Sequence, residues 1–242
     1  MILEVCTDSI ESAHIAQVAG AHRIELCTCL AEGGMTPSPA LISKTREIVS
    51  IQVYVLIRPR GGDFLYSDTE REMMKNDIHY CGQNECDGVV IGMLRPDGHV
   101  DREHCRELVQ IAQTYSMGVT FHRAFDRSND LFQAMEDIID LGCERILTSG
   151  GYNTAIEGTD VLRQLIEQAG NRITIMPGSG ITSENAGNLI QTTGLKELHG
   201  TFRSFYASGM QYRNEKLSHP ESEYTTGLPD VEKIRKILQL FS

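Results

Sequence analysis

ILEVCTDSIESAHIAQVAGAHRIELC, residues 2–27, places a segment with helical apolar spacing between two short apolar runs. The helical segment begins after Ser9, a favourable N-cap, and ends at Gly20, which tolerates the left-handed conformation at a helix C-terminus. The runs at residues 2–6 and 23–27 have the length and the aliphatic content of buried strands. A strand, a helix and a second strand in this order predict a parallel βαβ unit.

The same unit recurs along the whole chain of 242 residues. Short apolar runs predict strands at residues 2–6, 23–27, 53–58, 88–92, 119–122, 145–148, 173–176 and 196–199. Segments with helical spacing follow them at residues 9–20, 38–50, 67–80, 101–116, 129–141, 154–169, 182–193 and 230–241. Eight alternating units favour a closed (β/α)8 TIM barrel over an open doubly wound sheet. Residues 1–242 are therefore predicted to form a single domain, with a long loop at about residues 200–229 after the eighth strand.

Composition narrows the classes of partner. The formal net charge of -11 argues against a surface that binds nucleic acid or acidic lipid, because phosphates would be repelled. No apolar run is long enough to cross a bilayer, and residues 1–6 enter a strand without a secretory segment. Seven cysteines, an odd number in a long chain, indicate reduced thiols. We therefore expect a cytoplasmic protein with neither a nucleic-acid nor a membrane partner.

The alternation of side chains within the strands predicts a reactive mouth. Successive side chains of a strand point to opposite faces, and in a barrel the aliphatic face packs against the helices. The other face points to the axis, near the end of the barrel where active sites are built. The side chains expected to converge there are Glu4, Cys6, Glu25, Cys27, Arg58, His122 and His199.

Three of the loops that follow the strands are unusually long, at residues 27–38, 58–67 and 200–229. The third is rich in aromatic residues and has no helical period. We interpret it as either a lid over the mouth or a contact between subunits.

Sequence motifs at these strand ends and loops run through almost the whole chain in order. They are IELC at residues 24–27, EGGMTPS at 32–38, IRPRGGDF at 57–64 and FHRAFD at 121–126, with shorter matches EVC at 4–6, ILTSG at 146–150 and MQYRN at 210–214. In these motifs the chain resembles the CutC family of copper homeostasis proteins. The resemblance implies a βα barrel, a cytoplasmic location, frequent formation of a homodimer and a role in handling Cu(I). Pro177 and Thr201 depart from the family pattern, which affects the loops after the seventh and eighth strands.

Two cysteines at adjacent strand ends predict a copper site. Neighbouring strands lie about 5 Å apart, so Cys6 and Cys27 could hold an ion between their sulfurs. Cu(I) is a soft ion that prefers such donors, and Cys29 could add a third sulfur if the strand geometry continues. The alternative is that these cysteines pack as small apolar residues. We expect that packing role for Cys81, Cys86, Cys105 and Cys143.

A second interpretation is a TIM-barrel enzyme that acts on a small phosphorylated or carboxylated metabolite. Glu25 and His122 would be its proton carriers. The groups that would hold the anion are Arg58, Arg60, Arg123, His199, Thr148, Gly178 and Gly180. The opposing structural interpretation is that Glu4, Glu25 and Arg58 form a buried ion network that closes the barrel. A third possibility is a dimeric binding or scaffold protein whose partner docks on residues 200–229.

Overall fold

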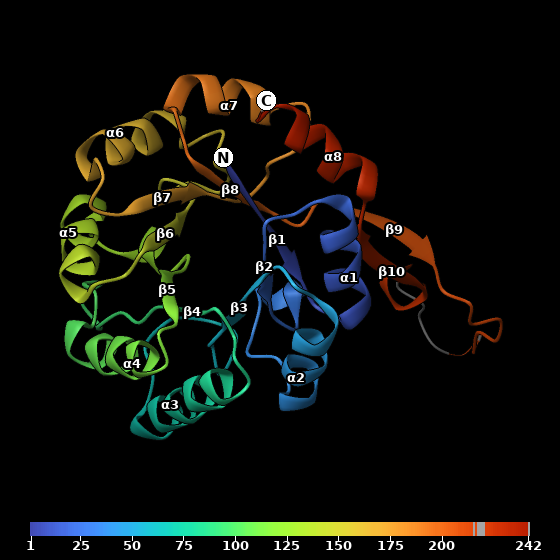
Figure 1. Ribbon diagram of the computed structural model, residues 1–242, viewed down its shortest axis with the longest axis horizontal. Coiled ribbons are helices and arrows are strands. Elements are labelled where there is room, and N and C mark those ends of the chain that lie inside the picture. Colours follow the sequence, from blue (N-terminus) through green and yellow to red (C-terminus); the bar gives the residue numbers. More distant parts are fainter. Residues whose placement is uncertain (215, 217–220, 242) are drawn as a thin grey trace.

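Eight parallel strands form a ring enclosed by helices in the computed structural model, which describes residues 1–214, 216 and 221–241 (Figure 1). The strands of the ring are β1 (Ile2–Thr7), β2 (Arg23–Leu26), β3 (Gln52–Leu56), β4 (Gly88–Ile91), β5 (Gly118–Phe121), β6 (Arg145–Thr148), β7 (Thr174–Pro177) and β8 (Glu197–Gly200). The hydrogen-bonded order is β7-β6-β5-β4-β3-β2-β1-β8, and β7 lies beside β8 at the seam of the ring. The predicted (β/α)8 TIM barrel is confirmed.

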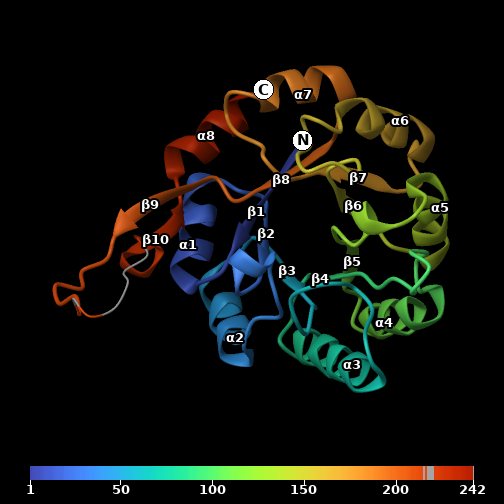
Figure 2. The ribbon, with the colours of Figure 1, turned by 180° about the vertical axis from the view of Figure 1, so that it is seen from behind.

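The outer layer follows the expected alternation of strand and helix, and Figures 1 and 2 view it from the two ends of the barrel. The helices are α1 (Ile10–Ala19), α2 (Pro39–Ile48), α3 (Asp68–Gln83), α4 (Arg102–Thr114), α5 (Leu131–Leu141), α6 (Thr159–Ala169), α7 (Ala186–Thr193) and α8 (Val231–Gln239). Short 3-10 turns occur at η1 (Leu30–Glu32), η2 (Phe125–Arg127) and η3 (Glu221–Tyr224). Ser9 and Ser67 form capping boxes that begin α1 and α3.

Two helices begin later than the apolar spacing predicts. Thr154 was expected to open a helix, but its Oγ1 accepts the N–H of Glu157 in a separate turn, and α6 begins at Thr159. Thr182 likewise precedes a turn in which its N–H donates to Asn185 Oδ1, and α7 begins at Ala186. A threonine hydroxyl or an asparagine amide that bonds to nearby backbone competes with the helix ladder, which explains both delays.

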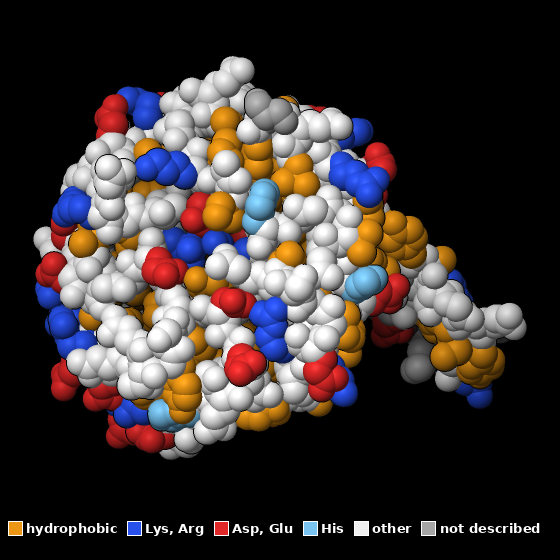
Figure 3. All heavy atoms as spheres, in the orientation of Figure 1, with side chains coloured by type: hydrophobic (Ala, Val, Ile, Leu, Met, Phe, Trp, Pro, Cys, Tyr) orange, Lys and Arg blue, Asp and Glu red, His pale blue; other side chains and the backbone are white. Residues whose placement is uncertain are grey.

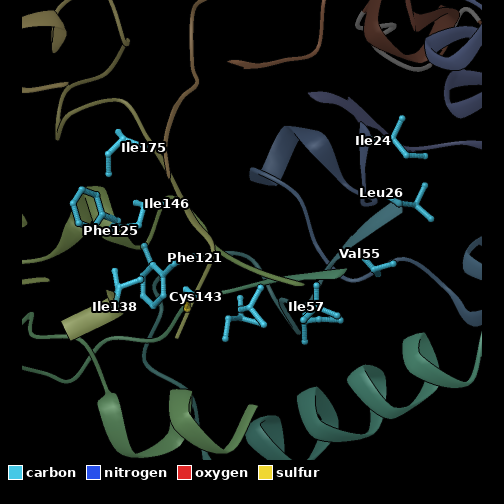
Figure 4. Close-up of a cluster of buried hydrophobic side chains, with 14 of the residues drawn as sticks. Ile24, Leu26, Val55, Ile57, Phe121, Phe125, Ile138, Cys143, Ile146 and Ile175 are labelled. Atoms are coloured by element: carbon cyan, nitrogen blue, oxygen red, sulfur yellow. The ribbon is translucent and has the colours of Figure 1, made fainter. Parts of the chain in front are cut away.

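The aliphatic faces of the strands build the main core against the helices, as the alternation predicts. Ile24, Leu26, Val55 and Ile57 lie on the outer side of β2 and β3, and Phe121 lies on that of β5 (Figure 4). A smaller apolar cluster lies on the inner face of the ring. Its members are Cys6, Cys27, Tyr54, Leu56 and Val90.

Below that inner cluster, the barrel interior is closed by a network of buried ions. The Arg23 guanidinium is fully buried and bonds to the carboxylates of both Glu4 and Glu197. Arg145 Nε lies 3.1 Å from the same Glu197 carboxylate. Both guanidiniums lie over the Tyr54 ring, with the Arg145 Cζ atom 4.8 Å from the ring centroid. An ion network therefore closes the barrel, but it is built on Arg23 and Arg145 and not on the expected Arg58.

The predicted loop at residues 200–229 contains regular structure that the sequence analysis did not anticipate. β9 (Arg203–Ala207) and β10 (Thr225–Pro229) pair in an antiparallel ribbon that extends away from the barrel (Figures 1 and 2). Hydrophobic side chains gather on this arm (Figure 3), where Phe205 is 74% and Tyr212 is 73% exposed. The arm does not lie over the ring of strands in this structure (Figures 1 and 2), and the predicted lid stays a prediction. The predicted contact between subunits stays a prediction.

Removing Arg23 should destabilise the barrel strongly. In an Arg23→Met variant the Glu4 and Glu197 carboxylates stay buried but lose their main counter-ion, and such losses typically cost about 3–5 kcal/mol. Urea unfolding of the purified protein measures this change. The matched control is Arg172→Ala, which removes an exposed ion pair with Glu136 and should leave the unfolding midpoint almost unchanged. Equal midpoints for the two variants would show that the buried network does not stabilise the fold.

Candidate functional site

A cavity of about 460 Å³ opens at the carboxyl ends of the strands. Its floor and walls include five of the side chains that the strand alternation placed there, namely Cys6, Glu25, Arg58, His122 and His199. The loops after β2, β5, β6, β7 and β8 complete its rim. The parallel strands end at one edge of the ring, so their last inward side chains meet although they are far apart in the sequence.

Cys6, which lines the floor of this cavity, forms a close pair with Cys27 beside it. Their sulfur atoms lie 3.6 Å apart, and both side chains are buried. Cys6 is directly opposite Glu25 in the β1–β2 register, and one ligand atom from each of the three residues lies within 4.8 Å of the others. The hydrogen bond with Cys27, together with burial and the charge of Glu25, raises the pKa of the Cys6 thiol.

Cys29 does not join this pair, although it was expected as a possible third sulfur. β2 ends at Leu26, and the chain then turns through Cys29, whose φ of 50° is in the left-handed region. The side chain of Cys29 is exposed, whereas that of Cys27 is buried. Cys29 was predicted to be a ligand only if the strand continued to it, and the strand ends before that residue. The remaining four cysteines are buried, as expected for packing residues, and all seven are free thiols.

A chain of polar groups connects the sulfur pair to the ion network below it. His199 Nδ1 lies 2.8 Å from Glu4 Oε1, and His199 Nε2 lies 3.8 Å from Glu25 Oε2. Burial lowers the pKa of His199, but the hydrogen bond to Glu4 and the charge of Glu25 outweigh it, so this pKa is raised. Burial raises the pKa of Glu25. The predicted role of Glu25 as a proton carrier stays a prediction.

His122 accepts one hydrogen bond in this structure, and its predicted role as a proton carrier stays a prediction. Its Nδ1 accepts the N–H of Ala124 at 3.2 Å, which leaves the ring proton on Nε2. Burial and the neighbouring Arg58 lower the pKa of His122 to about 3. The ring is therefore neutral near pH 7. Its Nε2 atom has no hydrogen-bond partner among the described residues.

Two of the arginines expected to hold an anion have other partners. Arg58 donates to the carbonyl oxygens of Glu32, Gly34 and Gly62 at 2.7–2.9 Å, and it thereby joins the loops after β2 and β3. Arg60 is not among the residues that line the cavity, and it pairs with the carboxylates of Asp63 and Glu70. Both terminal nitrogens of Arg58 are bonded but its Nε atom has no partner among the described residues, whereas the Arg60 guanidinium is paired with Asp63 and Glu70. Both assignments as anion ligands stay predictions.

The loop after β6 is also engaged internally. The Asp126 carboxylate accepts the Thr148 hydroxyl at 2.5 Å and the N–H groups of Ser149 and Gly151 at 3.1 and 2.8 Å. The N–H of Gly178 donates to the Thr148 carbonyl. The Thr148 hydroxyl and the Gly178 N–H are therefore engaged within the protein, and their predicted role in binding an external anion stays a prediction. Asp126 already supplies an anion to this loop.

Arg123 and Gly180, by contrast, line the cavity as predicted, and neither donates a hydrogen bond within the described residues. Arg127, which was not predicted, and Ser179, which belongs to the predicted turn at residues 178–180, also line it. Arg127 lies one residue beyond the FHRAFD motif, in the turn η2. Ser179 lies between two glycines that were themselves singled out.

Comparison with known proteins gives the same family over nearly the full length of the chain. The CutC family model matches residues 1–204. The copper homeostasis protein cutC homolog of Mus musculus is 47% identical over 240 residues, which cover 98% of this chain and 88% of the mouse protein. The family protein CutC of Pasteurella multocida is 48% identical over 223 residues, covering 92% of this chain and 91% of that protein. This chain belongs to the CutC family.

A crystal structure of a CutC protein from Streptococcus agalactiae has the same fold, with a TM-score of 0.79 and 36% sequence identity. The match covers 83% of this chain and 98% of the streptococcal one. All the cavity residues named above lie within the part matched by the CutC family model. None of the helices built from described residues is long and apolar enough to span a membrane.

The neutral state of buried His122 should make stability depend on pH. The pKa of His122 falls from 6.5 to about 3 on folding, so below pH 6.5 the unfolded chain takes up a proton that the folded protein excludes. This contribution to stability is complete above pH 6.5 and is lost as the pH falls toward 3. His122→Asn keeps an acceptor for the Ala124 N–H but cannot titrate.

Urea unfolding at several pH values from about 7 to about 5 tests this linkage. The parent should lose more stability than His122→Asn, by up to about 1.4 kcal/mol per pH unit. The control is His14→Asn, at an exposed position on α1, which should keep the slope of the parent. Identical slopes for the parent and His122→Asn would contradict the assignment.

Proposed function

We propose that this protein serves copper homeostasis by binding Cu(I) through Cys6 and Cys27. The observation that carries the proposal is the pair of buried thiols, 3.6 Å apart, of which Cys6 lines the cavity at the barrel mouth. Two further facts support it. The chain belongs to the CutC family, and its mouse relative is named a copper homeostasis protein.

The donor set suits a soft ion. Sulfur ligands select Cu(I), zinc or iron–sulfur clusters, whereas carboxylate and carbonyl oxygens suit harder ions. A structural zinc site normally takes four ligands, but the described residues offer two thiols and the Glu25 carboxylate at this point. A site with so few sulfurs favours Cu(I). The apolar side chains of Leu56 and Val90 beside the thiols limit the access of water.

Proton release should accompany metal binding. The pKa of Cys6 is raised by its hydrogen bond to Cys27 and by burial, so the copper-free site holds its thiol proton near neutral pH. A metal ion displaces that proton, and the apparent affinity should therefore increase with pH. Seven free thiols also suit a reducing compartment, and we include a cytoplasmic location in the proposal.

Replacing both cysteines should remove most of the copper affinity. The reduced parent is expected to bind about one Cu(I) per chain, and Cys6→Ser/Cys27→Ser exchanges soft donors for hard ones. Competition with a chromophoric Cu(I) chelator measures the affinity, and a parallel titration with Zn(II) measures selectivity. The matched control is Cys29→Ser, which removes an exposed sulfur from the same region and should bind like the parent.

Two outcomes would refute this proposal. One is tight Cu(I) binding that persists in the double variant. The other is an equal loss of affinity in the Cys29→Ser control, because that sulfur lies outside the buried pair.

A further inference from the structure

The sulfur pair accounts for only part of the cavity at the barrel mouth. An ion held between Cys6 and Cys27 would lie at the floor, whereas the cavity of about 460 Å³ extends to the loops after β5 and β7. Sites for small molecules typically have volumes of about 300–1,000 Å³. The upper part of the cavity therefore has room for a small molecule that the copper proposal does not require.

One wall of this space presents unused backbone donors. Within the described residues, the N–H groups of Ser179, Gly180 and Ile181 have no acceptor. The loop that carries them is held in place, because Ser179 O accepts the N–H of Ala155 at 3.0 Å and Ser179 Oγ donates to Asn153 O at 2.7 Å. Three adjacent donors on a fixed loop after the seventh strand suit a phosphate group.

In the neighbouring loop, after β6, the backbone N–H groups have an acceptor within the protein. The N–H groups of Ser149 and Gly151, after β6, both donate to the carboxylate of Asp126. No acidic side chain takes the same role for Ser179 and Gly180 among the described residues. The loop after β7 (the β7 loop) is therefore left with free N–H donors, whereas the donors of the loop after β6 are bonded to the Asp126 carboxylate.

The loop after β5, another part of the cavity wall, presents unpaired positive charge. The chain has a net charge of -11, and most of its arginines contact a carboxylate, but Arg123 and Arg127 have no ion-pair partner among the described residues. Both line the cavity. Burial and the charges of Arg58 and Arg127 lower the pKa of Arg123, and the charge of Asp126 offsets them only in part.

A buried donor completes the set. His122 lines the same cavity and is only 2% exposed, and its Nε2–H has no partner in the described part of the chain. A buried donor without an acceptor costs free energy, and a bound oxygen atom would remove that cost.

We propose that the mouth of the barrel binds a small phosphorylated carboxylic acid above the sulfur pair. Its phosphate accepts the N–H groups of Ser179, Gly180 and Ile181. Its carboxylate lies toward Arg123 and His122. Phosphate offers enough oxygen acceptors for three backbone donors, and a guanidinium matches a carboxylate through two parallel hydrogen bonds.

The test titrates the reduced, copper-free protein at constant ionic strength with two probes, 3-phosphoglycerate and inorganic phosphate. Calorimetry gives the affinities, and backbone amide NMR shows where each probe binds. Both probes should shift the amide signals of Ser179, Gly180 and Ile181. The 3-phosphoglycerate should bind about tenfold or more tightly than phosphate, because only it has a second anionic group for Arg123.

Variants separate the two ends of the ligand. Arg123→Ala should weaken 3-phosphoglycerate binding by about tenfold or more and leave phosphate binding unchanged. The matched control is Arg106→Ala, on the outer helix α4, where an exposed arginine also lacks an ion-pair partner in the described part of the chain. It should bind both probes like the parent. Cys6→Ser/Cys27→Ser should also bind both normally, which separates this proposal from the copper site.

Three results would overturn the proposal. The first is the absence of measurable binding of both probes. The second is amide shifts confined to residues outside the β7 loop. The third is an equal effect of Arg123→Ala and Arg106→Ala, which would reduce the role of Arg123 to general charge attraction.

Discussion

The buried guanidinium of Arg23 is the constraint on which the rest of the barrel depends. It bonds to Glu4 on β1 and to Glu197 on β8, and Arg145 on β6 shares the Glu197 carboxylate. Charges this deeply buried are tolerated when they are paired and hydrogen-bonded. The network therefore fixes the inner faces of β1, β2, β6 and β8 relative to one another.

Glu4 connects the ion network to the residues at the mouth of the barrel. One of its carboxylate oxygens bonds to Arg23 and the other to His199, whose second nitrogen faces Glu25. Burial raises the pKa of Glu4, but the charge of Arg23 outweighs it and lowers this pKa to about 2. Glu4 is thus an ionised support for His199. Along the barrel axis toward the carboxyl ends of the strands, the interior therefore holds first the paired ions, then the sulfur pair, and then the open cavity with its positive charge.

The loops decide which groups around that cavity remain free. Carbonyl oxygens of the loops after β2 and β3 accept hydrogen bonds from both terminal nitrogens of Arg58. Asp126 takes the N–H groups of the β6 loop. Arg123, His122 Nε2 and the β7 loop lack such partners within the described residues, and they face the same space. Copper and an organic anion would thus use different levels of one mouth.

The sequence by itself determined which side chains share the inner face of the barrel, because alternation along a strand is a local property. Cys6, Glu25, His122 and His199 were placed at one mouth for that reason. The same alternation puts Arg23 on the inner face of β2, two residues before Glu25, but its partner Glu197 is 174 positions away. Only the tertiary structure decided such pairings, along with the turn at Cys29 and the separate partners of Arg58 and Arg60. These depend on loop conformations and on contacts between distant segments, which no local pattern encodes.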